Sequence, residues 1–262
     1  MHRTHGDIRM EFQNVAAVVT GGASGLGAAT ARRLAARGCK VALFDMNKAQ
    51  GTALAGEIGG IFCTVDITSE EGVAAALDQA AAHHGTARIL VNCAGISRPA
   101  KTVGREFTPA PLAGFRQLIE INLIGTFNVI SKFAALLAAA DPLGEERGVI
   151  INTASAAAFE GQVGQASYAA SKGGVAAMTL PIARDLAPHG IRVMTIAPGL
   201  FITPMLLGLP QDVQDSLGRQ VPFPSRLGRP EEYAMLVESI ISNPMLNGET
   251  IRLDGAIRMG PK

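Results

Sequence analysis

Short apolar runs alternate with longer alanine- and leucine-rich stretches along almost the whole chain. The short runs hold few polar positions, which is typical of strands buried on both faces of a sheet. They predict strands over residues 16–20, 40–44, 61–65, 88–92, 149–152, 191–196 and 250–253. The longer stretches predict helices over 25–37, 48–58, 69–84, 113–139, 166–187, 212–220 and 230–242. This alternation predicts an α/β fold, in which a doubly wound parallel sheet of about seven strands carries helices on both faces.

We expect these elements to form a single domain over residues 13–262, because no internal repeat or low-complexity linker divides them. Its first half spans about 15–150 and its second half about 150–262. Residues 1–12 are expected to form a disordered lead, and they lack the apolar segment of a secretory signal. Met10 could instead be the true initiator.

Two proline-rich stretches interrupt the alternation. Residues 97–111 carry three prolines and follow the fourth predicted strand, and residues 200–225 carry four and follow the sixth. Both leave the carboxyl ends of strands, where ligands bind in open α/β sheets. We expect them to form lids or walls of a substrate site, although ordinary connecting loops remain the alternative.

Composition and charge exclude several classes of protein. The chain of 262 residues is 48% hydrophobic and 17% charged, enough apolar material for a large core. Its net charge of +1 gives no basic surface for nucleic acid. No run of about 18 apolar residues stands out, so we expect no membrane span. Three scattered cysteines without CxxC spacing predict reduced structural thiols and no metal site. The expected location is the cytoplasm, or the mitochondrial matrix in a eukaryote.

A glycine-rich turn follows the first predicted strand and opens the first predicted helix. It reads Thr20-Gly-Gly-Ala-Ser-Gly-Leu-Gly27, so it is not a GxGxxG fingerprint. Glycines permit a tight turn, close approach of the backbone to a pyrophosphate, and an anion at the helix N-terminus. A plain tight turn is the alternative. We expect a Rossmann-like dinucleotide site whose first contacts are Gly21, Ser24, Gly25, Leu26 and Gly27.

Asp45 ends the second predicted strand, eighteen residues after Gly27. An acid at this distance binds the adenosine ribose 2′-hydroxyl of a dinucleotide and repels a 2′-phosphate. Neither Arg nor Lys occurs in residues 21–27 or directly after Asp45. The pattern favours NAD over NADP as cofactor, unless Asp45 is only a solvated loop residue.

Tyr168 and Lys172 carry the candidate chemistry. Their spacing of four residues stacks both side chains on one face of a helix. An ammonium beside a phenol favours the phenolate and lowers the phenol pKa from its usual value of about 10. A phenol tuned in this way can exchange a proton with a substrate oxygen near neutral pH. Ser155 lies thirteen residues before Tyr168, at the end of an apolar run.

The pattern Ser-x12-Tyr-x3-Lys, with Asn122 in Glu120-Ile-Asn-Leu-Ile-Gly125, resembles the short-chain dehydrogenase/reductase family over about residues 15–259. The resemblance implies hydride transfer between a nicotinamide and a carbonyl or alcohol carbon. It implies that Tyr168 is the general acid/base and that Lys172 lowers its pKa and binds the nicotinamide ribose. It implies that Ser155 holds the substrate oxygen and that Asn122 anchors a water in a proton relay.

The same resemblance adds contacts to the cofactor. It implies adenine contacts from Asp66 and Ile67, although Asp66 could instead cap the helix near Ser69. The run Asn92-Cys-Ala-Gly95 departs from the family pattern, because Cys93 replaces an asparagine. The further cofactor residues implied are Cys93, Ala94, Gly95, Tyr168, Lys172, Pro198, Gly199, Phe201 and Thr203.

Longer runs resemble one subfamily, the type 2 3-hydroxyacyl-CoA dehydrogenases, also called type 10 17β-hydroxysteroid dehydrogenases. These runs include residues 149–168 and 246–259. The resemblance implies NAD as cofactor, an acyl-CoA as small-molecule substrate, and a homotetramer. The candidate substrate residues are Gln162, Gln165 and Leu206. Arg98, Lys101 and Arg105 could attract CoA phosphates, or could simply be solvated.

Three other functions are alternatives. The first is a dehydrogenase of a hydroxysteroid or another secondary alcohol. The second is a 3-oxoacyl carrier-protein or acetoacetyl-CoA reductase, against which Asp45 argues because such enzymes usually prefer NADPH. The third belongs to another class, a non-catalytic NAD-binding scaffold, which the intact set of Asn122, Ser155, Tyr168 and Lys172 argues against.

Overall fold

The computed structural model describes residues 10, 12–208 and 210–261. The expectation of a disordered lead therefore falls mostly on residues outside this part. Met10 and Phe12 are described, and both are buried in a hydrophobic cluster with strand and helix residues. These two residues therefore pack with the fold, and the expected boundary at residue 13 stays a prediction.

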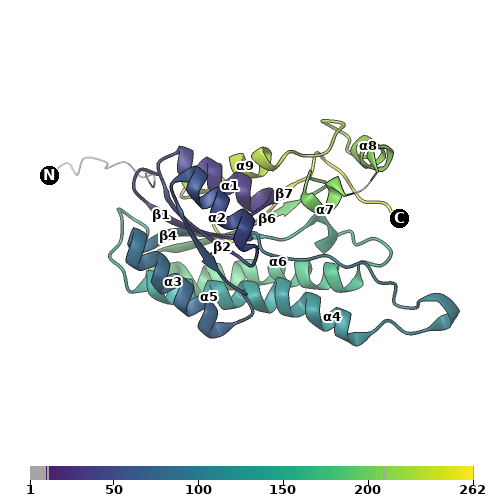
Figure 1. Ribbon diagram of the computed structural model, residues 1–262, viewed down its shortest axis with the longest axis horizontal. Coiled ribbons are helices and arrows are strands. Elements are labelled where there is room, and N and C mark those ends of the chain that lie inside the picture. Colours follow the sequence, from purple (N-terminus) through teal and green to yellow (C-terminus); the bar gives the residue numbers. More distant parts are fainter. Residues whose placement is uncertain (1–9, 11, 209, 262) are drawn as a thin grey trace.

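In the described part of the chain, seven parallel strands form one sheet in the order β3-β2-β1-β4-β5-β6-β7 (Figure 1). The strands are β1 (Ala16–Thr20), β2 (Lys40–Asp45), β3 (Ile61–Thr64), β4 (Ala87–Asn92), β5 (Gly148–Thr153), β6 (Ile191–Pro198) and β7 (Thr250–Leu253). The order reverses at β1, because β2 and β3 lie on one side of it and β4 to β7 on the other. The predicted doubly wound α/β fold is confirmed.

Helices cover both faces of the sheet, as Figure 1 shows. They are α1 (Gly25–Ala36), α2 (Lys48–Ile58), α3 (Glu70–His84), α4 (Leu112–Ile119), α5 (Thr126–Ala138), α6 (Ala166–Leu186), α7 (Pro204–Leu207), α8 (Gln211–Arg219) and α9 (Pro230–Ser242). One buried cluster packs α1, α2 and α9 on the first face. A second packs α3, α5 and α6 on the other. The alternation of apolar strands and helices in the sequence reflects this double burial.

The predicted helix over 113–139 is interrupted by a π-helical turn, Glu120–Gly125, between α4 and α5. By length and composition, this helix of 27 residues could cross a membrane, with a mean hydropathy of 1.5 over its most apolar window. The expectation of no membrane span stays a prediction. Half of that window is buried inside the fold, as in the core helix of many proteins.

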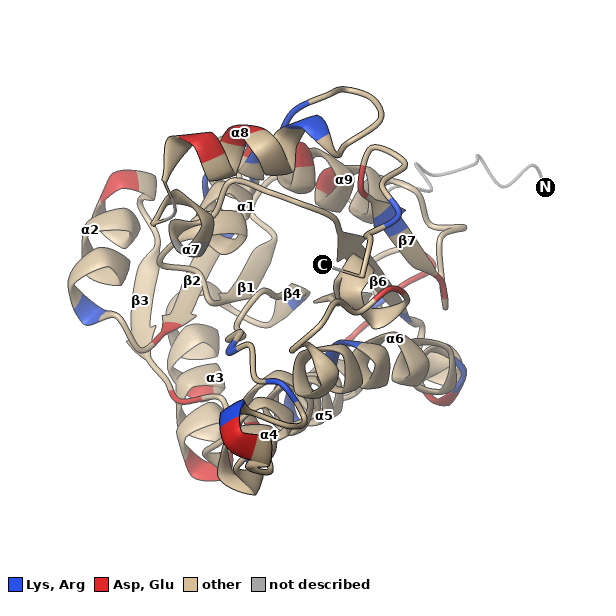
Figure 2. Ribbon diagram, turned by 90° about the vertical axis from the view of Figure 1, so that its right-hand side faces the viewer, with Lys and Arg blue, Asp and Glu red and all other residues tan. Residues whose placement is uncertain are grey.

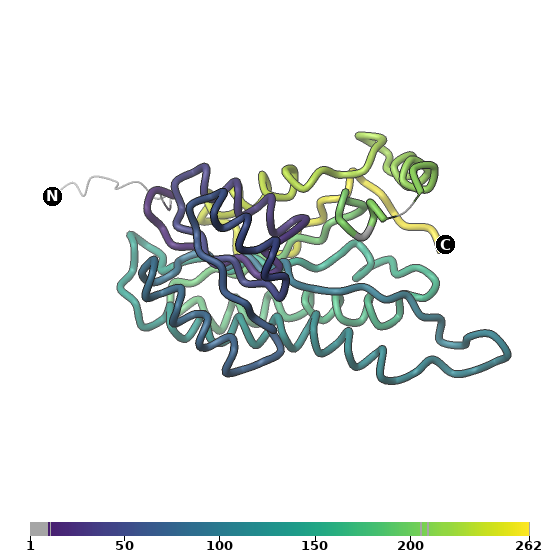
Figure 3. Tube along the Cα trace, in the orientation of Figure 1, coloured from purple at the N-terminus to yellow at the C-terminus, as the bar shows by residue number. Residues whose placement is uncertain are grey.

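Three segments gather beyond the carboxyl ends of the strands. They are the loop between β4 and α4, the loop between β5 and α6, and the C-terminal residues 254–261 (Figure 3). Figure 2 looks onto this edge and shows α4, α7 and α8 around the strand ends, with charged residues mostly on the surrounding helices and loops. The two proline-rich stretches of the sequence both lie here, where ligands bind in open α/β sheets.

Candidate active site

Lys172 and Tyr168 lie one turn apart on α6. Lys172 is 5% exposed, and its Nζ donates a hydrogen bond to the carbonyl oxygen of Thr153 at 2.8 Å. Burial lowers the pKa of Lys172 to about 8, while the nearby Cys93 acts in the opposite direction. The ammonium therefore ionises much closer to neutral pH than an exposed lysine would.

The pKa of Tyr168 is shifted in the direction opposite to the expected one. Burial raises the pKa of its phenol, and hydrogen bonding with Ser155 lowers it by less. The expectation of a lowered pKa is therefore not met, because the loss of solvation outweighs the hydrogen bond. Tyr168 is protonated at neutral pH and can donate a proton to a substrate oxygen.

Ser155 lies two residues beyond the end of β5, in extended conformation. Its Oγ accepts a hydrogen bond from the backbone N–H of Ala157 at 3.1 Å and begins the short 3-10 helix Ala156–Ala158. The strand end and this cap fix the direction of the hydroxyl, which hydrogen-bonds with Tyr168. Ser155, Tyr168 and Lys172 thus meet at the carboxyl end of β5.

Asn122 is fully buried in the π-helical turn. Its Oδ1 accepts from the backbone N–H of Ile96 at 2.8 Å, and its Nδ2 donates to the Ile96 carbonyl at 2.9 Å. The same Nδ2 lies 3.1 Å from Ser171 Oγ on α6. The side chain therefore ties the long helix to the β4–α4 loop and to α6. Its expected role in holding a water stays a prediction.

Comparisons with known proteins agree with this arrangement. Residues 15–214 match the model of the short chain dehydrogenase family. The chain belongs to the short-chain dehydrogenase/reductase family. It is 56% identical over 253 residues to 3-hydroxyacyl-CoA dehydrogenase type-2 of Rattus norvegicus, covering 95% of this chain and 97% of that protein. It is 53% identical over 254 residues to the protein of that name from Drosophila melanogaster, covering 95% and 100%.

A solved structure shows the same fold. The crystal structure of 3-hydroxyacyl-CoA dehydrogenase type-2 from Mycobacterium avium matches with a TM-score of 0.92 and 43% identity, covering 96% of this chain and 98% of that one. As a member of the short-chain dehydrogenase/reductase family, the chain is an oxidoreductase that works with a nicotinamide cofactor. The resemblance found in the sequence is confirmed.

The glycine turn fits a dinucleotide. Gly21 has a φ of +61°, and a Cβ on Gly27 would lie 2.1 Å from the Gly21 carbonyl oxygen, so neither position tolerates a side chain. The N-cap Ser24 makes no side-chain hydrogen bond to the helix, and the first turn of α1 holds no acidic residue. The N–H groups at the start of α1 are therefore free of a local carboxylate and suit a pyrophosphate.

Asp45 is fixed at the edge of this turn. Its Oδ2 accepts from the backbone N–H of Ala23 at 3.0 Å, and its Oδ1 accepts from Asn47 N–H at 2.9 Å. These bonds hold the carboxylate against the glycine turn. A freely solvated loop aspartate is therefore not what the structure contains.

Asp66 and Ile67 follow β3. Asp66 Oδ1 accepts from the N–H and hydroxyl of Thr68 at 2.9 and 2.7 Å. The cap of α3 is Ser69, whose Oγ accepts from Gly72 N–H. Asp66 is thus not the helix cap, and its adenine contact stays a prediction. The Ile67 side chain is buried in the core, so a contact with adenine would come from elsewhere on this residue.

Cys93, Ala94 and Gly95 directly follow β4. The N–H of Ala94 donates to Thr20 Oγ1 at 3.3 Å. A Cβ on Gly95 would lie 3.1 Å from Asn122 Oδ1 and 3.4 Å from Lys172 Nζ. Burial raises the pKa of the Cys93 thiol, which hydrogen-bonds with the Tyr233 hydroxyl. Among the described residues, no group of three or more His, Cys, Asp or Glu could hold a metal ion.

The residues expected beside the nicotinamide lie in different local environments. Gly199 has no room for a side chain, because a Cβ there would lie 2.7 Å from Asp254 Cβ. Thr203 is the N-cap of α7, which begins at Pro204. Phe201 is 7% exposed and packs into the core against Gly228. The Phe201 ring thus packs in the core, and the expected contact of this residue with cofactor stays a prediction. Pro198 ends β6 and is buried.

Gln162 and Gln165 line an open cleft of about 550 Å³ just before α6, together with Lys101 and Pro261. Gln165 Oε1 accepts from Gln162 N–H at 3.0 Å, and Gln162 Nε2 donates to the carbonyl oxygen of Gly260 at 3.2 Å. Both glutamines thus combine a local structural role with a place on the cleft wall. Leu206 is partly buried on α7 and does not line this cleft.

Proposed function

We propose that the chain is an NAD-dependent dehydrogenase that interconverts 3-hydroxyacyl-CoA and 3-oxoacyl-CoA. The observation that carries the proposal is the meeting of Ser155, Tyr168 and Lys172 at the end of β5 in a chain 56% identical to proteins of that name. Both the reaction type and the substrate class then follow from one site.

The residues divide the work at the reacting oxygen. Ser155 donates a hydrogen bond to this oxygen and holds it beside Tyr168. Tyr168 gives a proton to the oxygen in reduction, and its ionised form accepts one in oxidation. Lys172 places a positive charge next to this exchange, and Asn122 fixes the helix and loop behind it. The nicotinamide supplies or accepts the hydride when it is bound.

We infer NAD as the preferred cofactor. Support comes from Asp45, whose carboxylate is held at the glycine turn and would repel a 2′-phosphate. Initial rates with NADH should exceed those with NADPH by at least about tenfold, the effect of roughly one misplaced charge. Equal rates would contradict the inference. Asp45→Ser should reduce the difference between the two rates by raising the rate with NADPH.

An acyl-CoA is the proposed substrate because the cleft beside Gln162 and Gln165 is open and has Lys101 on its wall. The test follows NADH loss with acetoacetyl-CoA, with acetoacetyl-pantetheine and with a 17-ketosteroid. Fast turnover of the CoA ester and weak turnover of the pantetheine support the proposal. Equal or better turnover of the ketosteroid would favour a secondary-alcohol dehydrogenase, and no turnover of any ketone would favour a non-catalytic scaffold.

We further propose a homotetramer in a reducing compartment, the cytoplasm or a mitochondrial matrix, without nucleic acid or membrane as partner. Support for self-association comes from large apolar side chains exposed along α4 to α6: Leu112, Phe115, Ile124, Phe127, Leu136 and Leu180. Light scattering at micromolar concentration should give four times the chain mass of 27.2 kDa. A monomer would refute the tetramer.

A further inference from the structure

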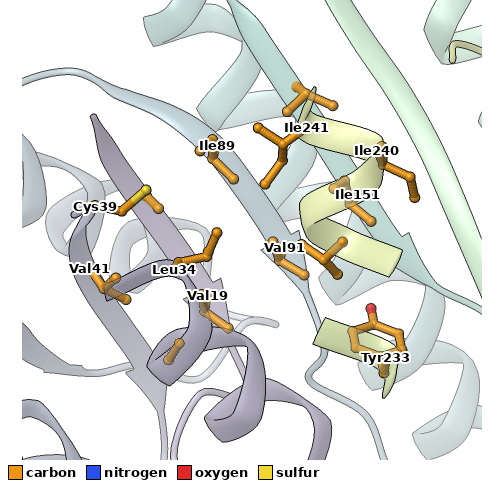
Figure 4. Packing of buried hydrophobic residues seen from close by; sticks show 14 of the residues in the cluster. Val19, Leu34, Cys39, Val41, Ile89, Val91, Ile151, Tyr233, Ile240 and Ile241 are labelled. Carbon is orange, nitrogen blue, oxygen red and sulfur yellow. The ribbon is translucent and has the colours of Figure 1, made fainter. Parts of the chain in front are cut away.

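The chain has two tyrosines, and the second, Tyr233, is fully buried on α9. Its ring lies in the hydrophobic cluster on the α1 and α9 side of the sheet (Figure 4), whereas α6 packs in the cluster on the other face. Its hydroxyl lies 2.7 Å from Thr153 Oγ1 and 3.7 Å from Cys93 Sγ. A buried phenol with polar partners is an expensive way to fill a core, since phenylalanine would pack as well.

The direction of each hydrogen bond follows from the partners. Thr153 Oγ1 lies 2.6 Å from the carbonyl oxygen of Asn92, which can only accept, so the threonine hydroxyl donates there. The Tyr233 hydroxyl then donates to Thr153 Oγ1 and accepts from the Cys93 thiol. Burial raises the pKa of Tyr233 well above its usual value, so the phenol stays protonated and keeps its donor.

Thr153 has a second connection, through its main chain. It is the last residue of β5, and its carbonyl oxygen accepts the hydrogen bond from Lys172 Nζ at 2.8 Å. Ser155 follows two residues later. The position of this one residue therefore influences both the ammonium and the serine hydroxyl of the site.

We propose that Tyr233 is a positioning residue for the dehydrogenase reaction, because its hydroxyl anchors Thr153, whose carbonyl holds Lys172 and whose chain leads to Ser155. The anchor reaches the site from the opposite face of the sheet. The proposal rests on the roles of Lys172 and Ser155 under the proposed function. The titratable groups that face one another here are Tyr168 and Lys172 on α6, Cys93 after β4, and Tyr233 on α9.

Tyr233→Phe removes the hydroxyl and keeps the ring. We expect kcat for the reduction of acetoacetyl-CoA to fall about fivefold, as for the loss of one hydrogen bond. The Thr153 carbonyl oxygen, which accepts the hydrogen bond from Lys172, is then held less firmly. The charged form of Lys172 is therefore less favoured. The alkaline fall of kcat/KM should then move to lower pH by about half a unit.

Val237→Ala is the matched control. Val237 is fully buried in the same cluster one turn further along α9, and its truncation leaves a cavity without touching the hydroxyl chain. We expect Val237→Ala to lower the melting temperature at least as much as Tyr233→Phe, with the pH profile unchanged. A shift of the profile in both variants would reduce Tyr233 to a structural residue and overturn the proposal.

Thr153→Val breaks the same chain from the other end. Because Tyr233 is proposed to act through Thr153, the double variant should lose about as much activity as the more damaged single variant, whereas independent effects would multiply and contradict the proposal. NADH binding followed by fluorescence across pH gives a readout without substrate. If the wild type does not reduce acetoacetyl-CoA, the proposed function fails, while a shifted alkaline limb of NADH binding in Tyr233→Phe still supports the anchor and an unshifted one refutes it.

Discussion

Lys172 is buried, and burial disfavours the charged form of its side chain. Burial lowers its pKa to about 8, so the side chain is charged below that pH and neutral above it. Because the ammonium is expected to bind the nicotinamide ribose, the affinity for NADH should be constant up to about pH 8 and fall above it. Fluorescence titration with NADH between pH 6 and 10 measures this. A constant affinity up to pH 10 would contradict it.

Tyr168 is the residue on which turnover depends most. Tyr168→Phe removes the only group proposed to exchange a proton with the substrate oxygen, so kcat should fall by about 10²–10⁴-fold. NADH binding should stay within about twofold of the wild type, since the ring remains and only one hydrogen bond is lost. Steady-state rates and fluorescence titration check both parts. Retention of a tenth of the activity or more would exclude Tyr168 as the general acid/base.

Single residues also mark the limit of what the sequence could predict. The spacing of Tyr168 and Lys172 predicts that both lie on one helix, and Asp45 is expected at the end of the second strand, where the structure has it. The hydrogen bond from Ala23 that holds Asp45 at the glycine turn could not be predicted. The raised pKa of Tyr168 could not be predicted, because burial depends on residues far away in the chain. The burial of the Phe201 ring could not be predicted either, because a sequence motif does not distinguish a side-chain contact from a backbone contact.

At the scale of elements, the C-terminal part of the chain is hydrogen-bonded to the loop between β5 and α6. We call these contacts, which involve Glu160 and Val163 of the loop, the clasp. Glu160 on this loop accepts two hydrogen bonds from Arg252 of β7, at 2.7 and 3.1 Å, and a third from Met259 N–H at 3.1 Å. Val163 N–H donates to the Pro261 carbonyl at 3.0 Å. The hydrogen bonds from Arg252 lower the pKa of Glu160, which keeps the clasp charged at neutral pH. This clasp holds one wall of the cleft that Gln162 and Gln165 line.

Loosening the clasp should therefore affect substrate more than cofactor. We expect Glu160→Gln to raise the KM for acetoacetyl-CoA about fivefold, the effect of weakening one charge-assisted hydrogen bond. The values of kcat and of KM for NADH should change little. Glu57→Gln is the matched control, because Glu57 pairs with Arg32 on the surface, where both side chains are about half exposed. A rise in both KM values, or none in either, would count against the clasp.

The elements themselves followed closely from the sequence. Each expected strand lies within two residues of its observed bounds, because strands buried on both faces read as continuous apolar runs. The four-residue helix α7 and the π-helical turn at Glu120–Gly125 were not predicted. Both depend on local backbone geometry set by neighbours in space, which side-chain periodicity does not report.

At the scale of the whole molecule, a buried ion pair joins parts of the fold far from the site. Arg192 at the start of β6 pairs with Glu146 at 2.6 Å, and both side chains are nearly inaccessible. The same guanidinium donates to the carbonyl oxygens of Ile240 at 2.9 Å, of Ile241 at 3.1 Å and of Leu246 at 3.0 Å. It therefore provides hydrogen-bond donors for the carbonyl groups at the C-terminal end of α9 and in the turn that leads to β7. Glu146 balances the charge that this arrangement buries.

Removal of Glu146 should leave that charge unpaired, so Glu146→Ala should lower the free energy of unfolding by about 3 kcal/mol. Glu57→Ala, which breaks an exposed pair, should cost less than about 1 kcal/mol. Urea unfolding at one fixed protein concentration compares the two, because self-association would make stability depend on concentration. The turnover number of folded Glu146→Ala at low temperature should match the wild type, since the pair lies at the opposite end of β6 from Pro198 and the site. Equal losses of stability in the two variants would show that the buried pair contributes no more than a surface one.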